Sequence, residues 1–282
     1  MTDHYAVVGN PIGHSKSPII HRLFAEQSGQ DMEYRAELGD LCDFEEQVAD
    51  WFKSDLQGLN VTLPFKERAL ALATKKTSRA VIAGASNTLR FNSKTAELEA
   101  DNTDGVGLMR DLQDRLGIEL KHKRILILGA GGATRGILGP ILEAHPALVA
   151  LTNRTEARAV SLVQSMQIAL GSCPLVFNAQ SELVQHHTAF DLIINATSAS
   201  LKGEVPPLPP GVWAEQTVAY DLAYVPSGET AFLAYARQQG ATKCADGLGM
   251  LVEQAAEAFY WWRGVLPDTA QVLKQLRSAL AK

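Results

Sequence analysis

The chain has 282 residues, of which 46% are hydrophobic and 20% charged, a composition typical of globular proteins. This length is sufficient for two hydrophobic cores, so we expect two domains. The formal net charge of -5 and the lack of a long Lys/Arg run argue against nucleic acid as a partner.

Membrane and metal chemistry are not expected either. The sequence has no run of about 18 apolar residues and does not begin with a basic segment followed by an apolar one. We therefore expect a cytoplasmic protein. The three cysteines, Cys42, Cys173 and Cys244, are far apart and lack neighbours at ligand spacing, which indicates small buried or half-buried hydrophobes and no metal site or disulfide.

Short β-branched runs alternate with helical patterns along the chain. The predicted strand and helix segments are, in order, 5–10, 17–27, 58–64, 65–73, 124–129, 133–144, 148–153, 158–167, 191–197, 217–224 and 231–240. This alternation predicts an α/β fold with a mainly parallel sheet covered by helices on both faces.

Two composition changes suggest where the domains meet. Residues 91–100 look like a polar hairpin or strand pair, and the mostly charged segment 119–124 precedes an apolar strand. After Asp246–Gly249, two helices are predicted over 250–263 and 267–281. We predict a first domain of residues 1–103, completed by 250–282, and a second domain of residues 104–249.

The second domain contains a glycine-rich turn between a strand and a helix. Gly129 permits a tight turn after the strand 124–128, and Gly131 lets the backbone approach a pyrophosphate. Free amides at the start of the following helix favour an anion. The third glycine position holds Thr134, so the match is incomplete. The predicted cofactor loop comprises Gly129, Ala130, Gly131, Gly132 and Ala133.

The end of the next strand indicates which dinucleotide is bound. Asn153, Arg154 and Thr155 follow residues 148–152, and no acidic residue is present to accept a ribose 2′-hydroxyl. Arg154 and Arg158 supply positive charge, and the Thr155 hydroxyl can bond a phosphate oxygen. This pattern predicts NADP(H) over NAD(H). The alternative is that the two arginines form a solvated helix face.

Four polar clusters interrupt the apolar segments of the first domain, at residues 9–18, 60–66, 84–89 and 101–105. In a strand, Asn60 and Thr62 share one face. The last three clusters also have a purely structural interpretation: Lys66 as a solvated lysine, Asn87 as a turn cap and Asp104 as a helix N-cap. Four such clusters in one small domain favour a binding site.

Taken in order, the motifs GNPIGHSKSP, NVTLPFK, GASNTL, DNTDGVG, GAGGATRG, NRT and DGLGMLVEQAA resemble those of the shikimate dehydrogenase family over nearly the whole chain. The resemblance implies reversible, NADPH-dependent reduction of 3-dehydroshikimate to shikimate in aromatic amino-acid biosynthesis. It also implies a substrate domain and a Rossmann-type cofactor domain around a cleft.

The resemblance also implies roles for individual residues. Ser15 and Ser17 are implied to bind the substrate carboxylate, and Pro18 suits the first position of a helix that Ser17 precedes. Lys66 and Asp104 are implied to be the catalytic pair, with Lys66 either the acid/base or an electrostatic stabiliser. The implied contacts to the ring hydroxyls or carboxylate are Thr62, Asn87, Tyr224 and Gln254, and those near the nicotinamide are Leu222 and Gly247.

Other functions are compatible with parts of the pattern. A quinate/shikimate or aminoshikimate dehydrogenase would share Lys66 and Asp104, but Ser17 and Arg154 favour shikimate with NADP(H). A non-catalytic NADP(H)-binding protein would not need the pair. A methylenetetrahydrofolate dehydrogenase would not need the paired serines. We expect a small-molecule substrate and a monomer or homodimer. The aromatic residues 259–262 are expected to belong to the core more than to a subunit interface.

Overall fold

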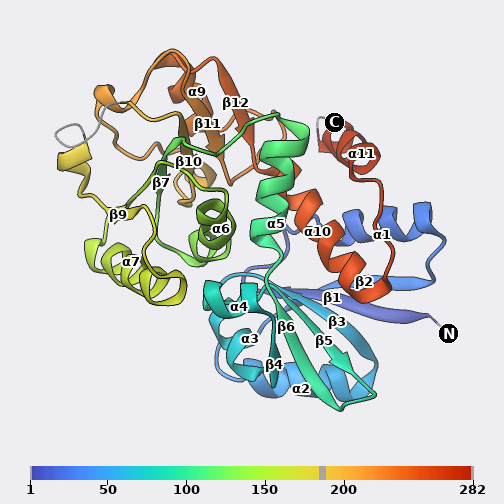
Figure 1. Ribbon diagram of the computed structural model, residues 1–282. Helices are drawn as coiled ribbons and strands as arrows, with labels where there is room; N and C mark the ends of the chain where they lie inside the picture. Colours follow the sequence, from blue (N-terminus) through green and yellow to red (C-terminus); the bar gives the residue numbers. More distant parts are fainter. Residues whose placement is uncertain (1, 184–188, 281–282) are drawn as a thin grey trace. The chain divides into compact units, whose positions relative to one another are not determined.

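The computed structural model describes residues 2–183 and 189–280 (Figure 1). The chain divides into two compact units. Unit 1 comprises Met1–Leu108 and Leu251–Ala279, and unit 2 comprises Met109–Met250 and Leu280–Lys282. Residues 104–108, which the sequence analysis assigned to the second domain, therefore lie in unit 1, and Met250 lies in unit 2.

Unit 1 contains a six-stranded sheet with the order β2-β1-β3-β5-β6-β4. Its strands are β1 (Asp3–Gly9), β2 (Met32–Leu38), β3 (Leu56–Val61), β4 (Lys75–Lys76), β5 (Thr88–Asn92) and β6 (Glu97–Asp101). Its helices are α1 (Ser17–Ser28), α2 (Phe44–Ser54), α3 (Lys66–Leu72), α4 (Ser78–Ala83), α5 (Asp104–Met109), α11 (Thr269–Leu280) and most of α10 (Leu248–Arg263).

The sheet of unit 1 is mixed. β1 runs parallel to β2 and β3, and β4 runs parallel to β6. β5 is antiparallel to both β3 and β6 because the predicted strand pair at 91–100 forms the hairpin β5–β6. Inserting this hairpin places the ends of β3 and β6, which both carry predicted site residues, on either side of the start of β5.

Apolar side chains cover both faces of this sheet. On one face, α2 and α3 pack through Phe44 and Phe65, whose rings stack at 4.4 Å. On the other, α1 and α10 meet through Phe24 and Phe259, at 5.7 Å between ring centroids. Figure 1 shows α1, α10 and α11 on the side of the sheet opposite to α2. The C-terminal helices therefore complete the core of unit 1.

Unit 2 contains a fully parallel six-stranded sheet with the order β12-β11-β10-β7-β8-β9. Its strands are β7 (Arg124–Leu128), β8 (Leu148–Thr152), β9 (Leu175–Phe177), β10 (Leu192–Asn195), β11 (Val218–Asp221) and β12 (Lys243–Asp246). Within the part of the chain that the structure describes, its α-helices are α6 (Gly132–Glu143), α7 (Glu156–Leu170), α9 (Ala231–Gln238) and the start of α10. The π-helical segment Arg110–Arg115 precedes β7. The order reverses beside β7, as in dinucleotide-binding sheets.

The expected α/β architecture with two domains is confirmed. No helix within the described ranges is long and apolar enough to cross a membrane. All three cysteines are free thiols, but Cys42 is exposed, contrary to the expectation of burial, because it lies in the loop between β2 and α2.

Candidate active site

Lys66 and Asp104 form an ion pair in unit 1. Lys66 is the first residue of α3 and Asp104 the first residue of α5, and the ammonium Nζ donates to Asp104 Oδ2. Their side chains are only 14% and 8% exposed. Lys66 is therefore not a solvated surface lysine, and the carboxylate of Asp104 does not act as the helix N-cap that its sequence position also allowed.

Asn87 lies beside this pair, just before β5. Its amide Nδ2 lies 2.7 Å from Asp104 Oδ1, 2.9 Å from Thr103 Oγ1 and 3.2 Å from Gln254 Oε1. Its Oδ1 accepts from the Thr103 amide at 2.9 Å. The side chain is buried. Asn87 therefore holds Oδ1 of the Asp104 carboxylate, while Lys66 holds Oδ2.

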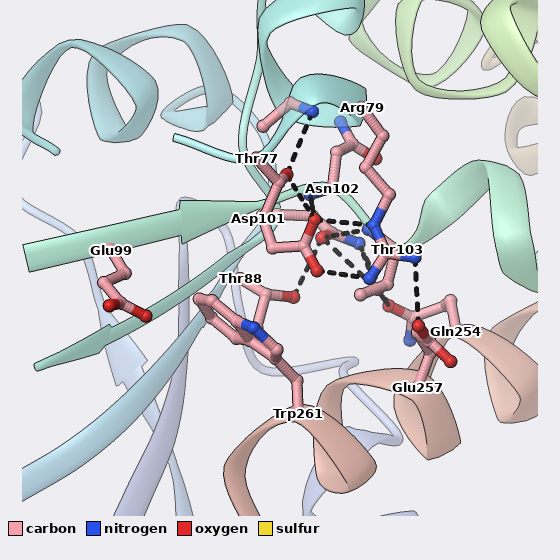
Figure 2. A network of polar contacts seen from close by, with 12 residues as sticks. Thr77, Arg79, Thr88, Glu99, Asp101, Asn102, Thr103, Gln254, Glu257 and Trp261 are labelled. Atoms are coloured by element: carbon pink, nitrogen blue, oxygen red, sulfur yellow. Dashed lines mark hydrogen bonds and ion pairs between the residues drawn. The ribbon is translucent and has the colours of Figure 1, made fainter. Parts of the chain in front are cut away.

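Gln254 reaches this cluster from α10. Besides the contact with Asn87, its Oε1 lies 3.4 Å from the Thr103 hydroxyl, and Figure 2 shows Gln254 facing Thr103. Four predicted site residues, Lys66, Asn87, Asp104 and Gln254, are thus brought together by elements far apart in the sequence. A buried cluster of alternating donors and acceptors is suited to binding a polyhydroxylated molecule.

The paired serines lie at the start of α1. Ser15 Oγ accepts from the Ser17 amide at 3.3 Å, and Ser17 is buried. The helix begins at Ser17 itself, with Lys16 at the N-cap, so Pro18 occupies the second helical position, one later than expected. Free amides at this helix start and two hydroxyls favour an anionic group.

Tyr34 and Asn60 link the serines to the Lys66 cluster. The Tyr34 hydroxyl donates to Asn60 Oδ1 at 2.6 Å and also hydrogen-bonds Ser17. Asn60 Nδ2 in turn donates to the Asn87 carbonyl at 3.2 Å. Thr62, which follows β3, lies against Gly9, where a Cβ atom would sit 2.5 Å from the Thr62 methyl group. The four polar sequence clusters therefore form one continuous network.

A buried histidine supports this network from behind. The His21 ring stacks on Tyr34 with 4.1 Å between centroids and an interplanar angle of 6°. Burial lowers the pKa of His21 to about 3, because an imidazolium would be desolvated there. His21 is therefore a neutral packing partner of Tyr34 at physiological pH.

In unit 2, the glycine turn between β7 and α6 has the geometry of a phosphate-binding loop. Gly129 has φ of +105°, and a Cβ atom there would lie 3.1 Å from the Ala196 carbonyl, so a side chain is disfavoured on both counts. A Cβ atom on Gly131 or Gly132 would meet nothing within 4 Å. This open space beside the start of α6 fits a pyrophosphate.

The incomplete glycine pattern has a structural explanation. Thr134 is buried, and its hydroxyl donates to the Gly129 carbonyl at 2.7 Å. That bond closes the turn from inside the first turn of α6. Threonine at this position therefore supports the turn geometry and does not fill the open space beside Gly131.

The residues after β8 also fit the expected cofactor. Asn153 Oδ1 accepts from the Ala130 amide at 3.2 Å, which joins this segment to the glycine turn. Arg154 precedes α7 and Arg158 lies in its first turn; both are exposed and neither has an ion pair among the residues that the structure describes. Thr155 is the N-cap residue of α7. Unpaired guanidinium groups there fit a 2′-phosphate.

Three further predicted residues lie at the ends of β11 and β12 in unit 2. A Cβ atom on Gly247 would sit 2.2 Å from the Leu222 carbonyl oxygen, so only glycine allows these two backbones to meet. Tyr224 follows β11 and is half-buried, and burial raises the pKa of its hydroxyl. Tyr224 belongs to unit 2, whereas the Lys66 cluster belongs to unit 1.

Three family models match the chain: the shikimate dehydrogenase substrate binding domain over residues 7–89, shikimate / quinate 5-dehydrogenase over 111–202, and the shikimate 5'-dehydrogenase C-terminal domain over 247–277. The chain is 52% identical over 280 residues to the shikimate dehydrogenase (NADP(+)) of Dechloromonas aromatica (strain RCB), with 99% of each chain covered. The chain belongs to the shikimate dehydrogenase family. The resemblance carried by the seven motifs is therefore confirmed.

Solved structures of similar proteins agree with this family. An Ael1 enzyme from Pseudomonas putida is 48% identical, with a TM-score of 0.88 and 98% of each chain covered. The shikimate 5-dehydrogenase of Thermus thermophilus, solved in complex with NADP(H) and shikimate, is 32% identical, with a TM-score of 0.85 and coverage of 99% of this chain and 100% of that chain. The two-domain α/β fold is thus that of the shikimate dehydrogenase family.

Sequence reasoning missed several residues that build the site. Tyr34, Asn102 and Thr103 contact the predicted residues directly, while Arg79 and Asp101 lie behind them. Asn102 and Thr103 stand inside the motif DNTDGVG, so that motif could have identified them. Tyr34 and Arg79 stand in segments without a recognisable pattern, and only the packing of distant strands and helices gives them a role.

Proposed function

We propose that the chain catalyses the reversible, NADPH-dependent reduction of 3-dehydroshikimate to shikimate, a step toward chorismate and the aromatic amino acids. The single observation that carries this proposal is the buried cluster of Lys66, Asn87, Asp104 and Gln254. Relatives that match 99% of the chain are shikimate dehydrogenases (NADP(+)), which supports it.

The reduction of a ketone to an alcohol requires a hydride at carbon and a proton at oxygen. NADPH, when bound, supplies the hydride. We assign its binding to the turn 129–133, with Arg154, Thr155 and Arg158 at the 2′-phosphate and the backbone of Leu222 and Gly247 near the nicotinamide. Support comes from the open space beside Gly131 and from Arg154 and Arg158, which have no ion pair within the described part of the chain.

Lys66 and Asp104 act on the oxygen of the reacting group. As negative charge develops on that oxygen, the Lys66 ammonium stabilises it and donates a proton, which leaves a neutral amine and an alcohol. In the reverse direction the amine accepts the hydroxyl proton. Asp104 holds the ammonium through one oxygen, and its carboxylate is the acceptor that a substrate hydroxyl would use. Burial strengthens both interactions because little water competes.

The other residues bind and orient the substrate. We assign the carboxylate to Ser15 and Ser17, where hydroxyls and helix amides combine. Asn87 fixes the Asp104 carboxylate, and its amide shares its two hydrogens among three acceptors, so it can redirect one to a ring hydroxyl. Thr62, Tyr224 and Gln254 are assigned to the remaining hydroxyl or carboxylate contacts.

The proposal extends to selectivity and cellular setting. Ser15 and Ser17 favour shikimate over quinate, which carries an extra hydroxyl on the carboxylate-bearing carbon, and Arg154 favours NADP(H) over NAD(H). We also propose a cytoplasmic enzyme that works as a monomer or homodimer. Gel filtration of the purified chain at several concentrations decides between the two states.

Initial rates with purified protein test the proposal. Reduced cofactor is followed by absorbance while shikimate or quinate is combined with NADP+ or NAD+. We expect rapid turnover only with shikimate and NADP+. Preferred turnover of quinate or NAD+ would assign the chain to the dual-specificity dehydrogenases, and no turnover with either substrate would contradict an enzymatic role for the cluster.

A further inference from the structure

Behind the candidate active site lies a second polar network that the proposed reaction does not use. Arg79, in the first turn of α4, donates from Nε to Asp101 Oδ1 at 2.6 Å and from Nη2 to Asp101 Oδ2. Its third nitrogen, Nη1, lies 2.9 Å from Glu257 Oε1 on α10. One guanidinium thus joins three elements, as Figure 2 shows.

Asp101 is the point at which this network meets the strand that leads into the site. Its side chain is fully buried and also accepts from the Thr77 hydroxyl at 2.6 Å and the Asn102 amide at 2.8 Å. Its backbone carbonyl accepts from the Asn87 amide at 3.2 Å. Asp101 therefore fixes both the start of the segment 102–104 and the backbone of Asn87.

Segment 102–104 connects Asp101 to Asp104 and Asn87. Asn102 Oδ1 accepts from the Asp104 amide at 3.1 Å, and the Thr103 amide donates to Asn87 Oδ1 at 2.9 Å. A shift of Asp101 would therefore move Asp104 and Asn87 together.

The contact with α10 acts on the other side of the site. Glu257 lies three residues after Gln254, so both project from the same face of the helix. The Arg79–Glu257 pair holds that face toward the end of β6, where Gln254 meets Asn87 and Thr103. Arg79 therefore sets the position of Gln254 as well as that of Asp104 and Asn87.

We propose that Arg79 is a positioning residue of the active site: through Asp101 and Glu257 it holds Asp104, Asn87 and Gln254 at the separation that substrate binding requires. In this role Arg79 acts through its two carboxylate partners. The inference rests on the proposed function, because the expected effect is on shikimate turnover.

Arg90 provides a matched control. It pairs with Glu99, two residues before Asp101 on the same strand face, at 2.6 Å, and it also contacts α10 through the Trp261 carbonyl at 2.7 Å. The side-chain exposure of Arg90 is 34%, against 30% for Arg79. Arg90 thus joins the same sheet to the same helix, but it does not contact the segment that leads to Asp104.

The test compares Arg79→Gln and Arg79→Lys with Arg90→Gln and Arg90→Lys. We expect kcat/KM for shikimate to fall by about tenfold or more in Arg79→Gln, because small displacements of reacting groups are costly. Arg79→Lys should recover only part of this kcat/KM, because one ammonium group cannot replace the planar guanidinium, which bonds both carboxylates at once. The Arg90 variants should lose thermal stability to a similar extent but keep kcat/KM, and KM for NADP+ should be unchanged in all four.

Glu257→Gln leaves the Arg79–Asp101 pair intact, so this variant keeps the fold even if Arg79→Gln does not. We expect Glu257→Gln to raise KM for shikimate by about threefold. Equal kcat/KM in the Arg79 and Arg90 variants, or no change in Glu257→Gln and Arg79→Lys, would overturn the inference. If the wild-type protein were inactive with shikimate, that result would instead contradict the proposed function itself.

Discussion

Replacing Asp104 by asparagine tests the geometry of the catalytic pair with the smallest change in shape. The carboxylate accepts on one oxygen from Lys66 and on the other from Asn87, at 2.7 Å. An asparagine has a single acceptor oxygen, and its amide group must then face one of these two donors. Whichever way the new side chain turns, its own buried NH2 group therefore faces a donor and not an acceptor.

The cost of this mismatch follows from the burial of the pair. A buried donor without an acceptor costs about 1–3 kcal/mol, which we expect as a loss in the free energy of unfolding. Catalysis should suffer more, because Lys66 loses its anionic partner and no carboxylate remains to accept a substrate hydroxyl. Loss of such a group typically lowers kcat by about 10²–10⁴-fold.

The assay is kcat/KM for shikimate with NADP+, together with urea unfolding, for Asp104→Asn and a matched variant, Glu99→Gln. Glu99 is a buried carboxylate on β6 that accepts from Arg90 and Asn92. We expect both variants to be less stable and only Asp104→Asn to lose activity. A kcat/KM in Asp104→Asn within about threefold of wild type would refute the reasoning.

Three further predictions concern the cofactor loop, its selectivity and the pH dependence of stability. Gly129→Ala places a side chain at positive φ and should lower the free energy of unfolding by about 1–2 kcal/mol, whereas Gly131→Ala should leave thermal stability unchanged and raise KM for NADP+ in the same rate assay. Arg154→Ala combined with Arg158→Ala should lower kcat/KM for NADP+ by about 10–100-fold with little change for NAD+; an equal loss with both cofactors would argue against a 2′-phosphate site. Burial lowers the pKa of His21 in the folded state, so its stabilising effect is complete above its unfolded pKa and is lost as the pH falls. Between pH 7 and pH 5, wild type should lose about 2 kcal/mol more free energy of unfolding than His21→Phe in urea titrations, and parallel curves would contradict this assignment.

Most of the cofactor domain could be predicted closely from its sequence because the central strands β7, β8 and β10 are continuous apolar runs. Residues 125–128 and 192–194 are buried on both faces of a parallel sheet, which makes their signal strong. The short strands β9 and β12 were missed. β9 spans only Leu175–Phe177, and β12 begins with an exposed lysine, so neither shows a run of buried residues.

The substrate domain was less predictable. β2, Met32–Leu38, is an edge strand in which no residue is fully buried. Its Met, Glu, Arg, Ala and Leu residues all favour helices. α2 was also missed, although Phe44 and Val48 already mark its buried face. The site residues within the motifs could be found from sequence, whereas Arg79 and Tyr34 acquire their contacts only through packing between distant elements.

The most direct test of the account is the single-turnover rate of NADPH oxidation with 3-dehydroshikimate, measured for wild type and Lys66→Met. Lys75→Met, which removes an exposed lysine paired with Glu99 at 3.4 Å, is the matched control. We predict a rate about 10²–10⁴-fold lower in Lys66→Met, with shikimate affinity changed only a few-fold, and no effect in the control. An unchanged rate in Lys66→Met would contradict the claim that this pair acts on the reacting oxygen.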